Sequence, residues 1–214
     1  MCIRDRLYIE LYEITKEKHY LDYVKQCNIE EYVPPDLNTQ FFTILALLKL
    51  NEIEDVQEQI FAMARRKVDN LCWSGKWKCN PEDQGFWMIL LSHIYKITGN
   101  EEMKSYVATL AKDTTWQFTC KNNRCPNALQ QAYLIMGYSY ASRILSTDNY
   151  NTAINNLVRK SSQDCKNMQC DDAVKQAWQI ISRIYMRHPD LMFFLVSGET
   201  MLQENTCLLY TSDA

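Results

Sequence analysis

Glycine and proline are scarce in this sequence, with only five of each in 214 residues. Turns between β-strands depend on these two residues, and no stretch alternates strictly between apolar and polar side chains, so β-hairpins have little room. Long apolar runs are missing as well. The longest, 41–48 and 191–196, fall far short of the about 20 residues that a membrane-spanning helix needs. We therefore expect an all-α protein with no transmembrane segment in this fragment.

No charge of one sign dominates either. The 23 Lys and Arg residues are interspersed with 26 Asp and Glu residues, giving a net charge of -3. This balance offers no basic footprint for a nucleic acid, so we expect no nucleic-acid partner. A glycine-rich phosphate loop and a metalloprotease motif are also missing, and we predict neither a cofactor nor a metal. The three histidines, His19, His93 and His188, have unrelated spacings and accompany no Ser or Cys motif, so a hydrolytic triad has no support.

The two ends of the chain do not read as native sequence. Residues 1–6 and 207–214 look like a translated sequencing adapter and are excluded from reasoning about the fold. The remaining span, 7–206, fits a single domain that is a fragment of a longer protein. Apolar residues make up 47% of the sequence and aromatic residues 12%. That content is enough to fill a core.

An aromatic tetrapeptide recurs through the chain at nearly constant spacing. Its four copies are Thr39–Phe42, Gln84–Trp87, Gln130–Tyr133 and Lys175–Trp178, separated by 45, 46 and 45 residues. Each copy is followed by apolar residues at helical spacing and then by a short polar turn. Helix pairs at a period of 40 to 47 residues indicate a stack or closed ring of hairpins, of which about four are present. Because the aromatic residues recur at one register, we interpret Phe42, Tyr133 and Trp178 as core residues and not as a ligand site.

Cysteines form close pairs at matching positions before three of these tetrapeptides. The pairs are Cys72–Cys79, Cys120–Cys125 and Cys165–Cys170, and Cys27 stands alone. Each pair closes a short loop in which two Cα atoms can lie within the ~6 Å that a disulfide requires. Zinc is the alternative, but tetrahedral zinc sites use closer pairs that face each other, usually with a histidine nearby. We favour disulfides, and hence an extracellular or cell-surface location.

One repeat carries an acidic pair that the others lack. Glu82 and Asp83 stand five and four residues before Trp87. The corresponding pairs in the other repeats are Leu37–Asn38, Ala128–Leu129 and Ala173–Val174. Retaining glycoside hydrolysis uses two carboxyl groups about 5 Å apart, one as acid/base and one as nucleophile. The alternative is ordinary stabilisation of a helix N-terminus by acidic side chains.

Aromatic residues directly before this pair fit a carbohydrate site. Trp73 and Trp77 offer flat faces to a sugar ring, and Lys76 and Lys78 offer hydrogen-bond donors. We predict that Trp73, Trp77 and Gln84 bind substrate, although Trp73 is also placed to cover the neighbouring disulfide.

The segments 80–87, 94–100 and 103–107 resemble the part of glycoside hydrolase family 76 that carries its catalytic aspartate pair. That family comprises endo-α-1,6-mannanases and related fungal cell-wall transglycosidases with an (α/α)6 toroid fold. The resemblance implies that Asp83 is the acid/base. It also implies that Glu82 replaces the aspartate nucleophile. A complete ring of six hairpins needs roughly 270 residues at this repeat length, so this chain would hold only part of it.

Three functions remain open at this point. The first is a secreted or cell-surface glycoside hydrolase or transglycosidase that acts on an α-mannan-like polysaccharide by a retaining mechanism. The second is a non-catalytic helical-repeat module that binds carbohydrate or protein, for which the replacement of Asp by Glu82 is the main indication. The third is another six-hairpin enzyme, such as an unsaturated-uronate hydrolase or a sugar epimerase.

Overall fold

The computed structural model describes residues 11–12, 14–20, 22, 44, 47–48, 50–51, 53, 55–71, 80–166 and 169–187. The longer elements within them are α4 (Gln57–Leu71), α5 (Pro81–Thr98), α6 (Glu101–Lys112), α7 (Trp116–Thr119), the 3-10 helix η1 (Lys121–Asn123), α8 (Ala128–Ile144), α9 (Asn151–Val158), β1 (Cys165–Lys166), β2 (Gln169–Cys170) and α10 (Ala173–Arg187). The predicted all-α class is confirmed, because the only sheet in this part is the two-stranded β1–β2 pair. None of the described helices combines the length and apolarity needed to cross a membrane.

Helices α5 and α6 begin and end at residues suited to those positions. The side chain of Asn80 accepts a hydrogen bond from the Glu82 amide (3.3 Å), and Pro81 occupies the first turn of α5. Gly99, at φ 69°, ends α5 in the left-handed conformation that glycine adopts without strain. Asn100 then caps α6 by accepting from the Glu102 amide (2.9 Å). The two helices are therefore joined by two residues and run antiparallel.

Helices α8 and α9 form the next pair. The side chain of Asn127 accepts from the Gln130 amide (2.9 Å) and fixes the start of α8. The connection to α9 is longer and passes through Ser146, whose φ of 50° is positive. α9 begins after Tyr150 without a side-chain cap.

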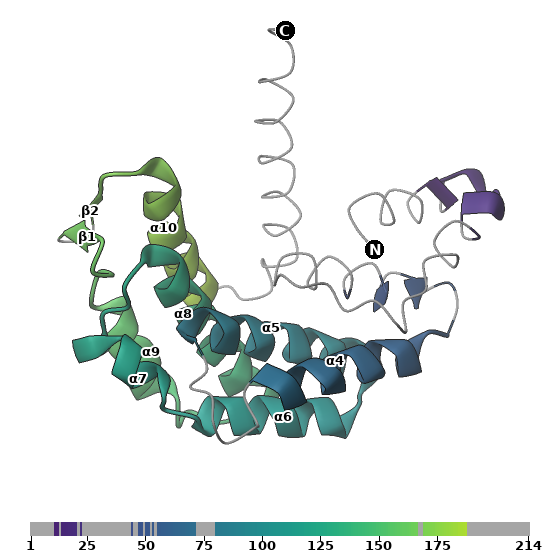
Figure 1. The fold of residues 1–214 in the computed structure, drawn as a ribbon, viewed down its shortest axis with the longest axis horizontal. Helices are drawn as coiled ribbons and strands as arrows, with labels where there is room; N and C mark the ends of the chain where they lie inside the picture. The colour runs from purple at the N-terminus through teal and green to yellow at the C-terminus, as the bar shows by residue number, and fades with distance from the viewer. Residues whose placement is uncertain are drawn as a thin grey trace, which may run out of the picture.

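Helix α8 packs against both α5 and α10 (Figure 1). α5 and α8 run in the same direction, because the backbone of Gly85 lies against Tyr133 and Gly137 of α8, and eight residues later His93 stacks near Tyr140 (ring centroids 5.0 Å apart). α10 runs the same way as α8, because Trp178 near its start packs against Tyr133 and Met186 near its end lies with Ser142. α6 contacts α5, and α9 contacts α8. The structure thus has parallel helices α5, α8 and α10, with α6 and α9 packed beside them.

The core lies between these helices. Its fully buried members include Trp87, Leu90, Ile94, Met103, Val107, Trp116, Leu134, Tyr138 and Leu157. Trp116 donates a hydrogen bond from Nε1 to the Tyr138 hydroxyl (2.8 Å), so this buried pair is joined by a polar contact as well. Tyr133 and Trp178 also pack against each other (centroids 5.5 Å apart). Tyr133 and Trp178 are partly buried and pack against the core, so their predicted structural role is confirmed at its edge, whereas Phe42 lies outside the described residues.

Two buried glutamines hold each helix to its partner in the same way. Gln84 donates from Nε2 to the carbonyl oxygens of Leu110 (2.7 Å) and Asp113 (2.8 Å). Gln131, 47 positions later, donates to those of Leu157 (2.8 Å) and Lys160 (2.6 Å). These carbonyls belong to the last turns of α6 and α9 and the residues just after them, where the regular helical hydrogen bonds run out. The carbonyls of Leu110 and Leu157 also accept from the backbone amides of Asp113 (3.1 Å) and Lys160 (3.3 Å).

A third glutamine extends this correspondence to α10. Gln131 Oε1 accepts from the Cys125 amide (3.1 Å), and Gln176 Oε1 accepts from the Cys170 amide (3.0 Å). Gln84 therefore corresponds to Gln131 and Gln176. The alignment based on the aromatic tetrapeptides was wrong by one residue in α8 and α10, because it matched Gln84 to Gln130 and Lys175.

Candidate functional site

Glu82 and Asp83 are the second and third residues of α5, at the end where the parallel helices α5, α8 and α10 begin. Both side chains are half-buried. In the register set by the buried glutamines, their counterparts are Leu129–Gln130 in α8 and Val174–Lys175 in α10. The counterparts predicted for these two helices were one residue too early, but the acidic pair is still found only in α5 among the three helices.

The electrostatic environment raises the pKa of one carboxyl group of the pair. Partial burial raises the pKa of Glu82, and the charge of neighbouring Asp83 raises it further. Glu82 thus holds its proton to a higher pH than an exposed glutamate would, which suits a general acid. The resemblance implies the acid/base role for Asp83, whereas the carboxyl group with the raised pKa is that of Glu82.

Gln84 has a different role from the one predicted. Its side chain is fully buried, and its amide nitrogen is occupied by two carbonyls of the α6 end. Its Oε1 makes no hydrogen bond of normal geometry within the described residues, although the Tyr138 hydroxyl is a neighbour. Gln84 joins α5 to α6 and is not accessible to a substrate.

The remaining predicted substrate contacts, Trp73 and Trp77, lie outside the described residues, as do Lys76 and Lys78. The same holds for the Cys72–Cys79 pair and Cys27.

The other two cysteine pairs are disulfides. The Cα atoms are 3.9 Å apart in Cys120–Cys125 and 4.4 Å apart in Cys165–Cys170. Each bridge closes the loop directly before a parallel helix, α8 in the first case and α10 in the second. Both loops therefore lie at the same end of the helices as Glu82 and Asp83.

Hydrogen bonds join these two disulfide loops to each other. The Arg124 guanidinium donates to the carbonyl oxygens of Ser161 (3.0 Å), Ser162 (3.1 Å) and Cys165 (3.4 Å). In return, the Gln163 amide donates to the Cys125 carbonyl oxygen (2.8 Å). The loops before α8 and α10 thus form one cross-linked layer.

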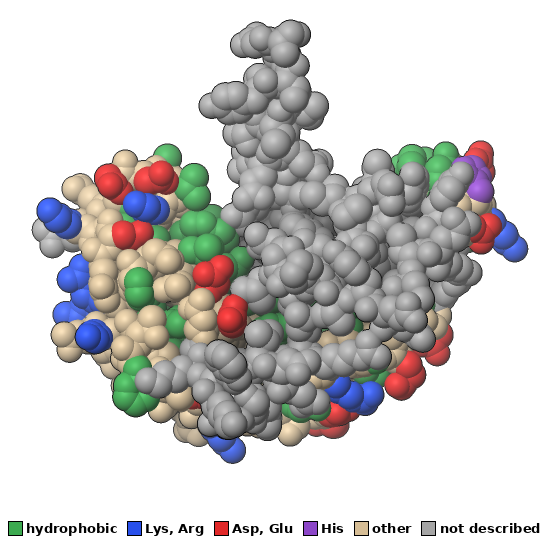
Figure 2. Space-filling view, viewed as in Figure 1, with side chains coloured by type: hydrophobic (Ala, Val, Ile, Leu, Met, Phe, Trp, Pro, Cys, Tyr) green, Lys and Arg blue, Asp and Glu red, His purple; other side chains and the backbone are tan. Residues whose placement is uncertain are grey.

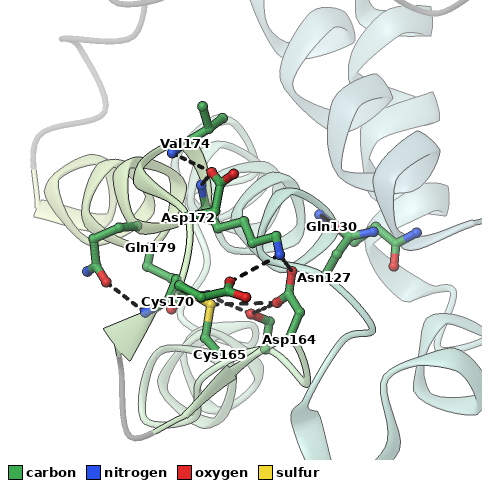
Figure 3. Close-up of polar contacts among 12 residues, drawn as sticks. Asn127, Gln130, Asp164, Cys165, Cys170, Asp172, Val174 and Gln179 are labelled. Atoms are coloured by element: carbon green, nitrogen blue, oxygen red, sulfur yellow. Dashed lines mark hydrogen bonds and ion pairs between the residues drawn. A yellow bond between two sulfur atoms is a disulfide. The ribbon is translucent and has the colours of Figure 1, made fainter.

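The start of α10 carries a charged cluster (Figure 3). Asp172 caps the helix by accepting from the amides of Val174 (2.7 Å) and Lys175 (3.1 Å). The ammonium group of Lys175 lies 3.3 Å from a carboxylate oxygen of Asp171 and 3.9 Å from one of Asp164. Lys175 occupies the position that Asp83 holds in α5, so this position changes from negative to positive charge across the three helices.

Gln130 is a candidate site residue that the sequence reasoning missed. It occupies the position of Asp83 on the adjacent helix, and its Oε1 is buried without a hydrogen-bond partner within the described residues. Its side chain points away from the cluster around Asp164 and Asp172 (Figure 3). An alignment of the repeats on Gln84 and Gln131 would have identified it, because that alignment places Gln130 at the position of Asp83.

Positive and negative side chains are interspersed on the visible face of the described residues (Figure 2), in keeping with the balanced composition. Comparison with protein-family models, with curated proteins and with solved structures finds no match.

Proposed function

We propose that this chain is part of a glycoside hydrolase or transglycosidase that acts on an α-mannan-like polysaccharide by a retaining mechanism, with Glu82 and Asp83 as its carboxyl groups. The observation that carries the proposal is the raised pKa of Glu82 next to Asp83 in the first turn of α5. A carboxyl group that is kept protonated to higher pH beside a second carboxyl group is the pattern expected of a general acid next to a nucleophile.

In the first step of this mechanism, protonated Glu82 donates its proton to the glycosidic oxygen while the Asp83 carboxylate attacks the anomeric carbon. The glycosidic bond breaks, and a glycosyl ester on Asp83 forms. Water, or a sugar hydroxyl in transglycosylation, then attacks this ester, and Glu82 takes up the proton that the attacking oxygen loses. Adjacent helical side chains leave the axis about 100° apart. The extra methylene of glutamate gives Glu82 the reach to approach the same bond as Asp83.

The fold features fit a toroid of the (α/α)6 type. Parallel helices α5, α8 and α10 would form the inner ring, and α6 and α9 would belong to the outer ring. The acidic pair would then stand at the end where the inner helices begin. The two disulfides support secretion or display at the cell surface, because such bonds persist in oxidising compartments.

The test is substitution of both carboxyl groups in the full-length protein. With α-1,6-mannan as substrate, we expect Glu82→Gln and Asp83→Asn each to lower kcat by about 10³-fold, the scale of lost general acid or nucleophilic catalysis. The matched control is Glu101→Gln, which removes a first-turn acid from α6. We expect this control to keep wild-type turnover, and circular dichroism melting curves should show all three variants folded.

Azide rescue assigns the two roles. We expect azide to restore turnover in both alanine variants, and the configuration of the glycosyl azide assigns the roles. Glu82→Ala should yield the azide with retained configuration, because azide attacks the glycosyl ester on Asp83. Asp83→Ala should yield the inverted azide, because azide attacks the anomeric carbon directly, and the opposite pair of configurations would exchange the roles. Wild-type rates in both Glu82→Gln and Asp83→Asn would refute the proposal.

A second candidate is a non-catalytic module that binds carbohydrate or protein. It is favoured by Glu82 itself, since the resemblance implies an aspartate there and a longer side chain displaces the carboxyl group. Glycan binding by the wild-type protein without any turnover would support this second candidate.

A further inference from the structure

A polar pocket lies at the end of the parallel helices opposite to Glu82 and Asp83. It has a volume of about 520 Å³ and is formed by the last turn of α8, the turn that follows it, the first turns of α9 and the end of α10. The lining residues on which the argument depends are Ser142, Arg143, Asp148, Ile154, Asn155 and Met186. The volume falls within the range of about 300–1,000 Å³ typical of small-molecule sites. Because α5 and α8 are parallel, this pocket is remote from Glu82 and Asp83.

The turn between α8 and α9 is held in place by its own hydrogen bonds. The Thr147 amide donates to the Ser142 carbonyl oxygen (3.0 Å), and the Asn151 side chain donates from Nδ2 to Asp148 Oδ1 (2.9 Å). Ser146, with φ at 50°, turns the chain back toward α9. The wall of the pocket is thus a defined loop structure.

Ser142 supplies an unsatisfied polar group in the wall. Its Oγ is buried and has no hydrogen-bond partner within the described residues. Buried hydroxyl groups in native proteins are nearly always hydrogen-bonded, since an unpaired one costs free energy. Rotation of the Ser142 side chain about its Cα–Cβ bond, toward the pocket, would let a ligand hydroxyl group supply the missing partner.

The rest of the lining narrows the ligand chemistry. Arg143 and Asp148 contribute one charge of each sign, so the pocket favours neither an anion nor a cation strongly. Asn155 adds an amide that can donate and accept. Ile154 and Met186 add an apolar surface suited to the C–H face of a ring.

We propose that this pocket binds a neutral polyhydroxylated ligand, namely one or two sugar units of an uncharged glycan. The site is separate from the acidic pair and does not depend on the proposed catalytic function. Vicinal hydroxyl groups match the paired donors and acceptors of Arg143, Asp148 and Asn155, and the hydroxyl of Ser142 gains its missing hydrogen bond.

The experiment titrates the full-length protein carrying Glu82→Gln with α-1,6-mannobiose and with cellobiose, monitored by isothermal calorimetry and by NMR shifts of the pocket amides. Asn155→Ala and Asn156→Ala form a matched pair, because both residues are exposed on α9 and only Asn155 lines the pocket. We expect binding of at least one disaccharide to weaken about five- to tenfold in Asn155→Ala, the effect of one lost hydrogen bond, and to remain unchanged in Asn156→Ala. Ser142→Ala should weaken binding similarly while leaving the melting temperature equal or higher, since it removes an unpaired hydroxyl.

Three results would overturn the proposal. The first is no binding of either sugar at millimolar concentration, and the second is equal weakening in Asn155→Ala and Asn156→Ala. The third is tighter binding of inorganic phosphate than of both disaccharides, which would indicate an anion site centred on Arg143. Because Glu82 is already substituted, none of these results bears on turnover at the acidic pair.

Discussion

The α5–α6 pair and the α8–α9 pair share a framework but differ at both ends. Gln84 and Gln131 tie each long helix to its partner through the same carbonyl positions. The first turn of α5 carries Glu82 and Asp83, whereas the same turn of α8 carries Leu129 and Gln130. The repeated residues account for the fold, and the residues that break the repeat are the candidates for function.

The opposite ends differ in the length of the turn. Two residues, 99–100, join α5 to α6, whereas six residues, 145–150, join α8 to α9. The longer turn supplies part of the wall of the polar pocket. A departure from the repeat therefore coincides with a candidate site at each end of the parallel helices α5 and α8.

We expect the largest loss of stability when the glutamines shared by the two helix pairs are substituted. Gln131→Leu removes three hydrogen bonds, from the Cys125 amide and to the carbonyls of Leu157 and Lys160. Each lost hydrogen bond costs about 1 kcal/mol, so we expect a loss of about 3 kcal/mol. Gln84→Leu removes only the two hydrogen bonds to the carbonyls of Leu110 and Asp113, and we expect about 2 kcal/mol. Urea unfolding of both variants measures the difference, and a larger loss at Gln84 would contradict the comparison.

We expect a smaller loss of stability from a substitution at a position where α5 and α8 carry side chains of different volume. Gly85 in α5 corresponds to Ala132 in α8. A Cβ atom at Gly85 would meet the carbonyl carbon and oxygen of Tyr133 at 2.3 Å, so α5 and α8 would have to move apart. We expect Gly85→Ala to destabilise the protein by about 2 kcal/mol, because this strain outweighs the better helix propensity of alanine. Thermal unfolding measures it.

The control for this prediction is the reverse change at the corresponding position. Ala132→Gly opens space without creating a clash, so we expect a loss of about 1 kcal/mol from lower helix propensity and the small cavity. Stabilisation by Gly85→Ala would show that the close approach of α5 and α8 is not required.

Much of this framework was predictable from sequence because it depends on local patterns. The helical period, the caps at Asn80 and Asn100 and the turn at Gly99 are readable in the chain, and so were the Cys120–Cys125 and Cys165–Cys170 pairs. The register of the repeat was not predictable in this way. The aromatic residues gave the wrong register. The correct register is set by buried glutamines, whose hydrogen-bond partners lie 26 and 29 residues away along the chain.

The candidate site was less predictable than the fold. Glu82 and Asp83 could be named as candidates from sequence, but the depth of their burial depends on neighbouring helices, and this burial raises the pKa of Glu82. Gln84 was misread because it adjoins the acidic pair in sequence while its side chain turns toward α6. The polar pocket combines residues from α8, α9 and α10, so no local sequence motif predicts it.

The last prediction concerns the pH dependence of stability. It depends on a third position at which α5 and α8 carry different residues. His93 in α5 corresponds to Tyr140 in α8, and the two rings are neighbours. Burial, aided by the charge of Lys96, lowers the pKa of His93 from 6.5 to about 4. As the pH falls, the His93 imidazole of the unfolded chain is therefore protonated near pH 6.5, whereas that of the folded chain is protonated only near pH 4. His93 therefore opposes folding increasingly as the pH falls between these values.

We expect the free energy of unfolding to fall by about 1.5 kcal/mol from this source between pH 6.5 and pH 5, and His93→Gln to remove that part of the pH dependence. Chemical denaturation of both proteins across this range measures it. Subtracting the two curves cancels the contributions of carboxyl groups such as Glu82 and Glu102, whose pKa values are shifted in opposite directions. Parallel curves would mean that His93 is protonated equally in the folded and unfolded states, and that the α5–α8 contact tolerates a charge beside Tyr140.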